Sequence, residues 1–191
     1  MIRLCALLLA ALLCCNAAAA QSAHDLLAGE TRGINPRYLL QDPNGRSVTS
    51  EDFRGRFQLI SFGYTYCPDI CPTTLVEMAA ILKQLGDQAD RLQPVFITVD
   101  PERDTPGVLR EYLAAFDPSF IALRGTLEQT EKTAREFKAF YQKVPTGSSY
   151  AMDHSALTYV FDTTGKVRLA LRHADTAQQY ADDLRQLMGT S

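Results

Sequence analysis

Two cysteines lie between a short apolar run and a segment of helical periodicity, and this junction constrains the fold more than any other feature of the 191-residue chain. The apolar run covers residues 57–62 and ends at Gly63, as a buried strand would. The motif Cys67-Pro68-Asp69-Ile70-Cys71-Pro72 follows it. Beyond the motif, apolar residues recur at helical spacing: Leu75, Met78, Ala79, Leu82 and Leu85. The sequence therefore predicts a strand that leads through both cysteines into a helix.

The rest of the chain alternates strands and helices. Residues 95–99 predict a second buried strand, and Thr105-Pro106 supplies a cap and a first-turn proline for the next helix. Further on we expect a short strand at 121–123, a helix from Thr126 to about Tyr141, a polar loop over 144–153, a hairpin of strands 156–161 and 167–171, and a last helix from Asp175. This βαβα(α)ββα order predicts an α/β, thioredoxin-like fold with its chemistry at the first strand-to-helix junction.

The start of the domain carries the signature of a hairpin. The turn Asp42-Pro43-Asn44-Gly45 lies between two short strand-like runs, because proline presets φ and Asn-Gly supplies positive φ. We therefore expect an N-terminal β-hairpin addition to the fold. The chain is long enough for one domain, which we place at 37–191, and we expect residues 21–36 to be a flexible lead-in.

The first twenty residues have the pattern of an export signal. Arg3 precedes an apolar stretch at 4–15, and the alanines at 17–20 suit signal-peptidase cleavage. We expect a cleaved signal peptide at 1–20 and a periplasmic protein; the alternative is an uncleaved segment that anchors the chain to the inner membrane. The charge is nearly balanced, with 19 Lys+Arg against 22 Asp+Glu, and no basic block supports nucleic-acid binding.

Export changes the cysteine count. Cys5, Cys14 and Cys15 lie in the segment to be removed, which leaves Cys67 and Cys71 as a pair in an oxidising compartment. Such a pair forms a disulfide bond, a redox couple or a metal site. Because backbone N–H groups and the dipole at a helix N-terminus stabilise thiolates, we expect both sulfurs to be activated. Three intervening residues also allow the two sulfurs to share one ion.

Two thiolates suit Cu(I) and also Zn(II), and an imidazole would complete a trigonal copper site. His154 is the best placed histidine, at the end of an irregular loop and before a buried strand, although a lone histidine there could equally bond within its loop. His173 follows a strand and has the setting of a solvated residue. His24 would bind Cu(II) at the amino terminus only if processing left Ser22 first.

Two further features lie near these residues in the sequence. Met152 is a candidate weak thioether ligand, but we expect it to pack in the loop. Asp100, Arg103 and Asp104 follow the second strand, and we expect them to form an ion-pair network at the rim of the site.

Three sequence blocks carry a family resemblance. The segments 63–72, 100–106 and 153–155 with Tyr159 and Asp162 occur in the order found in the Sco/SenC/PrrC group of copper-binding assembly proteins for cytochrome oxidase, which the chain resembles across residues 37–188. Tyr66 and Met152 stand where the group more often has other residues, and neither change removes a ligand.

The resemblance implies a copper chaperone with a thioredoxin fold. It implies one copper ion, Cu(I) or Cu(II), held by Cys67, Cys71 and His154 and delivered to the binuclear copper site of a cytochrome c oxidase subunit. The expected partners are that subunit, an upstream copper donor and a thiol reductant, and we expect a monomer. The alternative is a thiol–disulfide oxidoreductase in which Cys67 and Cys71 are the catalytic, redox-active pair that reduces the cysteines of that copper site. A thiol peroxidase is disfavoured, because no Thr/Arg arrangement marks a peroxide pocket.

Overall fold

The structure, a computed structural model of the chain, describes Thr31 and residues 33–172 and 176–189. The compact unit that holds the site begins at Ile34. The predicted signal segment at 1–20, most of the lead-in, His24, His173 and Asp175 lie outside the described residues. Within the described ranges, no helix has both the length and the apolar character needed to cross a membrane.

A five-stranded sheet forms the centre of the unit, in the order β5-β4-β3-β8-β9. Its strands are β3 (Phe57–Gly63), β4 (Leu92–Thr98), β5 (Ile121–Leu123), β8 (Thr158–Phe161) and β9 (Val167–Leu171). β3, β4 and β5 pair in parallel, whereas β8 pairs antiparallel with both β3 and β9. Every residue of β3 and β4 is buried, which explains their nearly continuous apolar sequences.

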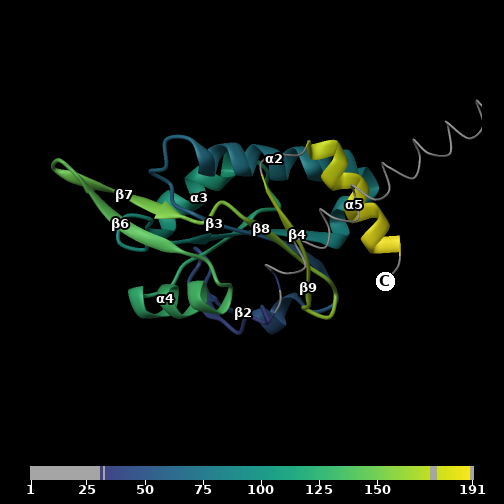
Figure 1. Cartoon of the computed structure of the whole chain (residues 1–191), viewed down its shortest axis with the longest axis horizontal. Helices are drawn as coiled ribbons and strands as arrows, with labels where there is room; N and C mark the ends of the chain where they lie inside the picture. Colours follow the sequence, from purple (N-terminus) through teal and green to yellow (C-terminus); the bar gives the residue numbers. More distant parts are fainter. Residues whose placement is uncertain (1–30, 32, 173–175, 190–191) are drawn as a thin grey trace, which may run out of the picture. The chain divides into compact units, whose positions relative to one another are not determined.

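Helices cover the sheet on both faces (Figure 1). One face carries α2 (Ile70–Leu85), α3 (Pro106–Ala114) and α5 (Ala177–Gly189), and the other carries α4 (Leu127–Glu136) and the hairpin of β1 (Leu39–Gln41) and β2 (Ser47–Thr49). Each face of the sheet packs a hydrophobic core, the first core beneath α2, α3 and α5 and the second core on the opposite face. Side chains of β3 alternate between them: Phe57 and Leu59 enter the first core, and Ile60 and Phe62 enter the second. The arrangement is the predicted thioredoxin-like fold with an N-terminal hairpin.

Local sequence signals explain how the elements begin. Thr105 Oγ1 accepts a hydrogen bond from Val108 N at 3.4 Å, and Pro106 occupies the first turn of α3. Thr126 and Gln129 form a capping box at the start of α4. Two short 3₁₀ helices, η1 (Ser50–Phe53) and η2 (Gly86–Arg91), complete the helical elements described.

Two predictions about the region before His154 are wrong. The helix from Thr126 ends at Glu136 rather than near Tyr141, and Lys138 has a φ of 54° just after it. The expected loop at 144–153 is instead a hairpin of β6 (Tyr141–Thr146) and β7 (Ser149–His154), which form a sheet of their own. Figure 1 shows this hairpin projecting beyond the central strands. Both strands are largely polar and partly exposed, so they lack the apolar alternation by which a strand is recognised.

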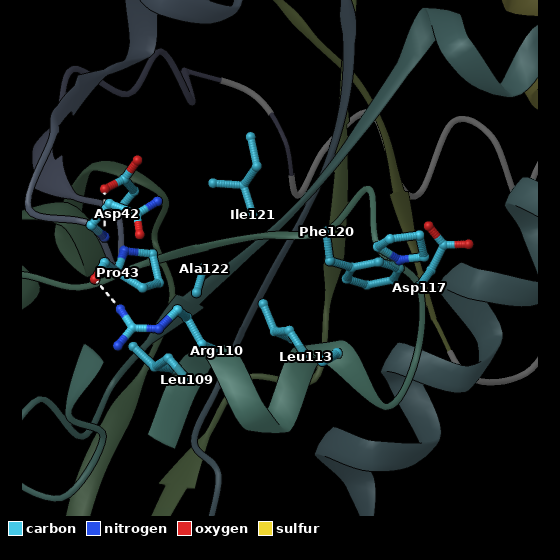
Figure 2. Close-up of a pocket in the computed structure, with 12 residues that line it drawn as sticks. Asp42, Pro43, Leu109, Arg110, Leu113, Asp117, Phe120, Ile121 and Ala122 are labelled. Atoms are coloured by element: carbon cyan, nitrogen blue, oxygen red, sulfur yellow. Dashed lines mark hydrogen bonds between the residues drawn. The ribbon is translucent and has the colours of Figure 1, made fainter. Parts of the chain in front are cut away.

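A cavity of about 260 Å³ opens between α3, β5 and the turn of the β1–β2 hairpin (Figure 2). Leu109, Leu113 and Phe120 line its apolar part, and Arg110 Nη1 donates a hydrogen bond to the Pro43 carbonyl at 2.5 Å. The cysteines and His154 are not among the residues that line this cavity. It is therefore separate from the predicted metal site.

Candidate metal centre

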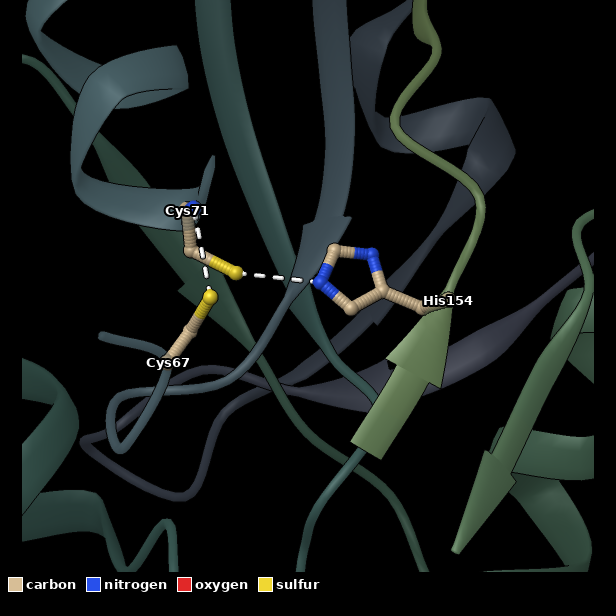
Figure 3. Close-up of side chains that lie close together, drawn as sticks. All are labelled: Cys67, Cys71 and His154. Atoms are coloured by element: carbon tan, nitrogen blue, oxygen red, sulfur yellow. Dashed lines mark hydrogen bonds between the residues drawn. The ribbon is translucent and has the colours of Figure 1, made fainter. Parts of the chain in front are cut away.

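The thiols lie where β3 passes into α2. β3 ends at Gly63 and α2 begins at Ile70, so Cys67 lies in the connecting loop and Cys71 in the first helical turn. The Cys71 N–H donates a hydrogen bond to Cys67 Sγ at 3.4 Å (Figure 3). A backbone donor at the helix start thus points at one of the two sulfurs, as the sequence predicts.

His154 is the last residue of β7, and its ring turns toward the cysteines (Figure 3). Its Nδ1 lies 3.0 Å from the Ser155 carbonyl oxygen. A carbonyl only accepts hydrogen bonds, so Nδ1 carries the proton and Nε2 keeps a free lone pair. Nε2 lies 3.1 Å from Cys71 Sγ, which places the lone pair against the second thiol. The ring also makes an edge-to-face contact with Tyr64, with centroids 5.9 Å apart.

All three predicted ligand residues come together. The Sγ atoms of Cys67 and Cys71 and one ring nitrogen of His154 lie within 4.8 Å of one another. Both cysteines are free thiols in this structure. Two sulfurs and one imidazole nitrogen form a soft donor set that suits Cu(I) or Zn(II). The group can therefore hold a single metal ion.

The expected activation of both sulfurs is wrong for Cys71. This residue is 2% exposed, and burial raises the pKa of its thiol well above the usual range. The cost of burying a thiolate is the largest cause of this shift in the metal-free protein. Burial also lowers the pKa of His154, which favours the neutral imidazole that binds metals.

Gly63 gives the Cys71 sulfur its space. A Cβ atom on Gly63 would lie 2.8 Å from Cys71 Sγ and 2.7 Å from Cε2 of Phe96, closer than such atoms approach. Sequence reasoning treated Gly63 only as the end of a strand. The signal that could have identified its role is a glycine four residues before the first cysteine, at the end of a strand rich in large apolar residues.

The segment 100–104 forms only part of the expected ion-pair network. Asp100 pairs with Arg103, whose Nε lies 2.5 Å from the carboxylate. Asp104 is fully buried, and its carboxylate accepts hydrogen bonds from Thr65 Oγ1 at 2.6 Å and Thr98 Oγ1 at 2.5 Å. Within the described part of the chain it makes no ion pair, because it lies below the rim and ties the loop before Cys67 to the end of β4.

Of the other candidate ligands, His24 and His173 lie outside the described residues, and burial decides the role of Met152. Met152 is 7% exposed and packs in the second core, as expected for a packing residue. Tyr150 and Lys143 of the β6–β7 hairpin contact Arg103 and Glu102, and sequence reasoning missed both. Their signal was hidden because the hairpin itself was not predicted.

Comparison with known proteins gives a consistent result. Residues 28–189 match the family model described as SCO1/SenC. A SCO2-like protein of Rickettsia felis is 45% identical over 136 residues, which cover 70% of this chain and 66% of that protein. The chain thus spans just under two thirds of the length of that relative.

Solved structures show the same fold. ScoI of Bradyrhizobium japonicum, described with copper bound, is 40% identical with a TM-score of 0.75, covering 80% of this chain and 98% of that one. Yeast Sco1 with copper bound is 32% identical with a TM-score of 0.77, covering 83% and 90% respectively. The family match extends over most of the chain and includes the strand-to-helix junction and the histidine hairpin, so the chain belongs to the SCO1/SenC family.

Proposed function

We propose that the protein holds one copper ion on Cys67, Cys71 and His154 and delivers it to the copper-site subunit of a cytochrome c oxidase during assembly. The observation that carries the proposal is the convergence of two Sγ atoms and a ring nitrogen within 4.8 Å. Copper-bound structures of two relatives support the choice of metal. The family resemblance to oxidase assembly proteins supports the choice of partner.

The ligand residues differ in whether they must lose a proton to bind copper. His154 presents Nε2 without losing a proton, because its Nδ1 proton is held by the Ser155 carbonyl. Cys71 must lose its proton, since the thiolate is the form that binds metal. Release to a partner then proceeds by ligand exchange, in which donor atoms of the partner replace these three in turn.

The proposal includes further partners and a location. A Cys67–Cys71 disulfide would remove both sulfur ligands, so loading requires a thiol reductant as well as an upstream copper donor. We place this work in the periplasm, with the export signal at 1–20 either cleaved or kept as an anchor in the inner membrane, and we propose that the protein acts as a monomer.

Copper stoichiometry of the reduced protein tests the ligand set. Wild-type protein should bind one tight Cu(I), and Cys67→Ser, Cys71→Ser and His154→Ala should each lose tight binding, because three ligands are too few to spare one. Met152→Leu serves as a control, since it keeps the buried volume while removing the thioether. Retention of one tight copper after loss of any one ligand would contradict the three-ligand site.

A second function is favoured by the difference between the two sulfurs. Cys67 is partly exposed while Cys71 is buried behind it, an arrangement suited to an attacking and a resolving thiol. In that role the two thiols would form a disulfide and pass two electrons and two protons to a disulfide of the oxidase copper site. His154→Ala separates the functions: a reductase keeps its activity in this variant, whereas copper transfer is lost.

A further inference from the structure

We propose that residues 100–104 form a spacer that fixes the distance between the thiols and the imidazole, and that Tyr150 is the residue through which this spacer positions His154. None of these residues is a ligand. The inference rests on the proposed copper function. It assigns a role to contacts that the three ligands alone do not explain.

The spacer is attached firmly to the thiol side. Asp104 accepts hydrogen bonds from the Thr65 N–H and hydroxyl, and Thr65 lies two residues before Cys67. The same carboxylate accepts a hydrogen bond from Thr98 at the end of β4. Arg103 adds contacts with the rings of Tyr64 and Tyr66, at 5.7 and 4.9 Å from the centroids. The loop that carries Cys67 is therefore held to the spacer by several bonds.

Tyr150 attaches the spacer to the histidine side. Its hydroxyl donates a hydrogen bond to Asp100 Oδ1 at 2.9 Å, and its carbonyl accepts one from Arg103 Nη1 at 2.9 Å. The Arg103 guanidinium lies 3.6 Å from the centre of the Tyr150 ring, and Lys143 Nζ lies 3.9 Å from it. Lys143 also pairs with Glu102 at 2.7 Å, so the hairpin has two links to the spacer.

The hairpin lies outside the central sheet, and these links add to the packing of Met152 in the second core. β6 and β7 pair with each other in a two-stranded sheet, and such a sheet is marginal by itself. Tyr150 and His154 are four residues apart on β7, roughly 13 Å along an extended strand. A shift of the hairpin at Tyr150 is therefore transmitted to Nε2 at the other end of the strand. Tyr150 acts as a positioning residue for the imidazole.

Weakening the link should reduce the fraction of molecules in which His154 faces the thiols. Copper affinity falls in proportion to that fraction. A variant in which about one tenth of the molecules keep the hairpin in place therefore binds copper about tenfold more weakly. Tyr150→Ala removes both the hydroxyl and the ring and should reach this size. Tyr150→Phe keeps the ring contacts and should lose about threefold.

A double-mutant cycle with His154 tests this role. Cu(I) affinity is measured by competition with a chelator for Tyr150→Ala and Tyr150→Phe, each with His154 present and in the His154→Ala background. The loss should appear only with His154 present, because the two thiolates do not depend on the hairpin. An equal loss in both backgrounds, or no loss with His154 present, overturns the proposal. Tyr38→Phe removes a buried hydroxyl that has no hydrogen-bond partner in the described residues, and should leave affinity unchanged.

Amide hydrogen exchange of the reduced, metal-free protein gives a readout independent of copper. Exchange in β6 and β7 should rise in Tyr150→Phe and rise further in Tyr150→Ala, while β3 and β4 keep the wild-type rates. Unchanged exchange in the hairpin of both variants overturns the proposal. A wild-type protein that binds no copper refutes the proposed function instead, and the exchange rates then decide by themselves whether Tyr150 fixes the hairpin.

Discussion

The two sides of the candidate metal centre are built in different ways. Cys71 lies in the first turn of α2, 2% exposed, with its sulfur packed against Gly63 at the end of a fully buried strand. His154 lies at the end of a polar hairpin that is separate from the central sheet and held by side-chain contacts. The comparison shows that the core fixes the sulfur side, while the imidazole is carried by a polar hairpin that packs Met152 in the second core and is linked by side chains to residues 100–104.

The largest expected effect concerns protons, and it separates the two sides. Burial raises the pKa of the Cys71 thiol, so the thiol stays protonated at neutral pH and must release a proton when metal binds. The Cys71 thiol should therefore contribute about a tenfold rise in copper affinity for each unit of pH, for example from about pH 7 to about pH 8. The lowered pKa of His154 means that its ring is already neutral in this range and releases no proton.

Competition titrations over this pH range measure the slope. His154→Ala should bind more weakly but keep the dependence on pH, whereas Cys71→Ser should lose the part that comes from the buried thiol. An affinity that does not change with pH would show that Cys71 is already ionised in the metal-free protein.

The packing of the sulfur side predicts the next largest effect. Gly63→Ala places a Cβ atom against Cys71 Sγ and Phe96, so side chains or backbone must shift. We expect a loss of about 1–3 kcal/mol in the free energy of unfolding, together with weaker copper binding. Denaturant unfolding and chelator competition measure the two effects.

Gly107→Ala is the matched control for this substitution. A Cβ atom there would lie 4.0 Å from Thr105 Oγ1, an ordinary contact, and alanine favours a helix over glycine. This variant should be as stable as the wild type or slightly more stable. If the two alanine variants behaved alike, close packing at Gly63 would not be what fixes the sulfur.

The smallest expected effect lies on the histidine side. Glu102→Gln breaks the ion pair with Lys143. The side chains of both partners are about half exposed. Exposed pairs contribute little and are screened by salt, so copper affinity should fall by no more than about twofold, and less at high salt. A loss as large as that of Tyr150→Ala would show that the ion pair, rather than the tyrosine, holds the hairpin.

The difference between the two sides also explains what the sequence could predict. The strand, the cysteine motif and the helix of the sulfur side follow one another along the chain, so apolar patterning and cap residues identify them. The hairpin has no apolar alternation, and its links join Tyr150 to Asp100 and Lys143 to Glu102, about fifty and forty residues apart. The chain pattern therefore predicted a loop where the structure has two strands.

Burial was the second quantity that local sequence could not supply. A position at a helix start indicates an activated thiol, which is the reasoning that failed for Cys71. Its raised pKa comes chiefly from burial in the second core, whose residues come from separate parts of the chain, and also from the neighbouring Cys67 and Asp104. The sequence predicted the three candidate ligand residues that the structure brings together, whereas the protonation of one of them required the packed structure.

Ser155 links the closure of the hairpin to the chemistry of the ring. Its N–H donates to the Phe140 carbonyl, its hydroxyl accepts from the Phe140 N–H, and its own carbonyl holds the Nδ1 proton of His154. Opening the base of the hairpin would therefore also break the hydrogen bond that keeps the proton on Nδ1. The ring ¹⁵N signals of His154 consequently report in solution whether the strand ends are joined, with no metal needed as a probe.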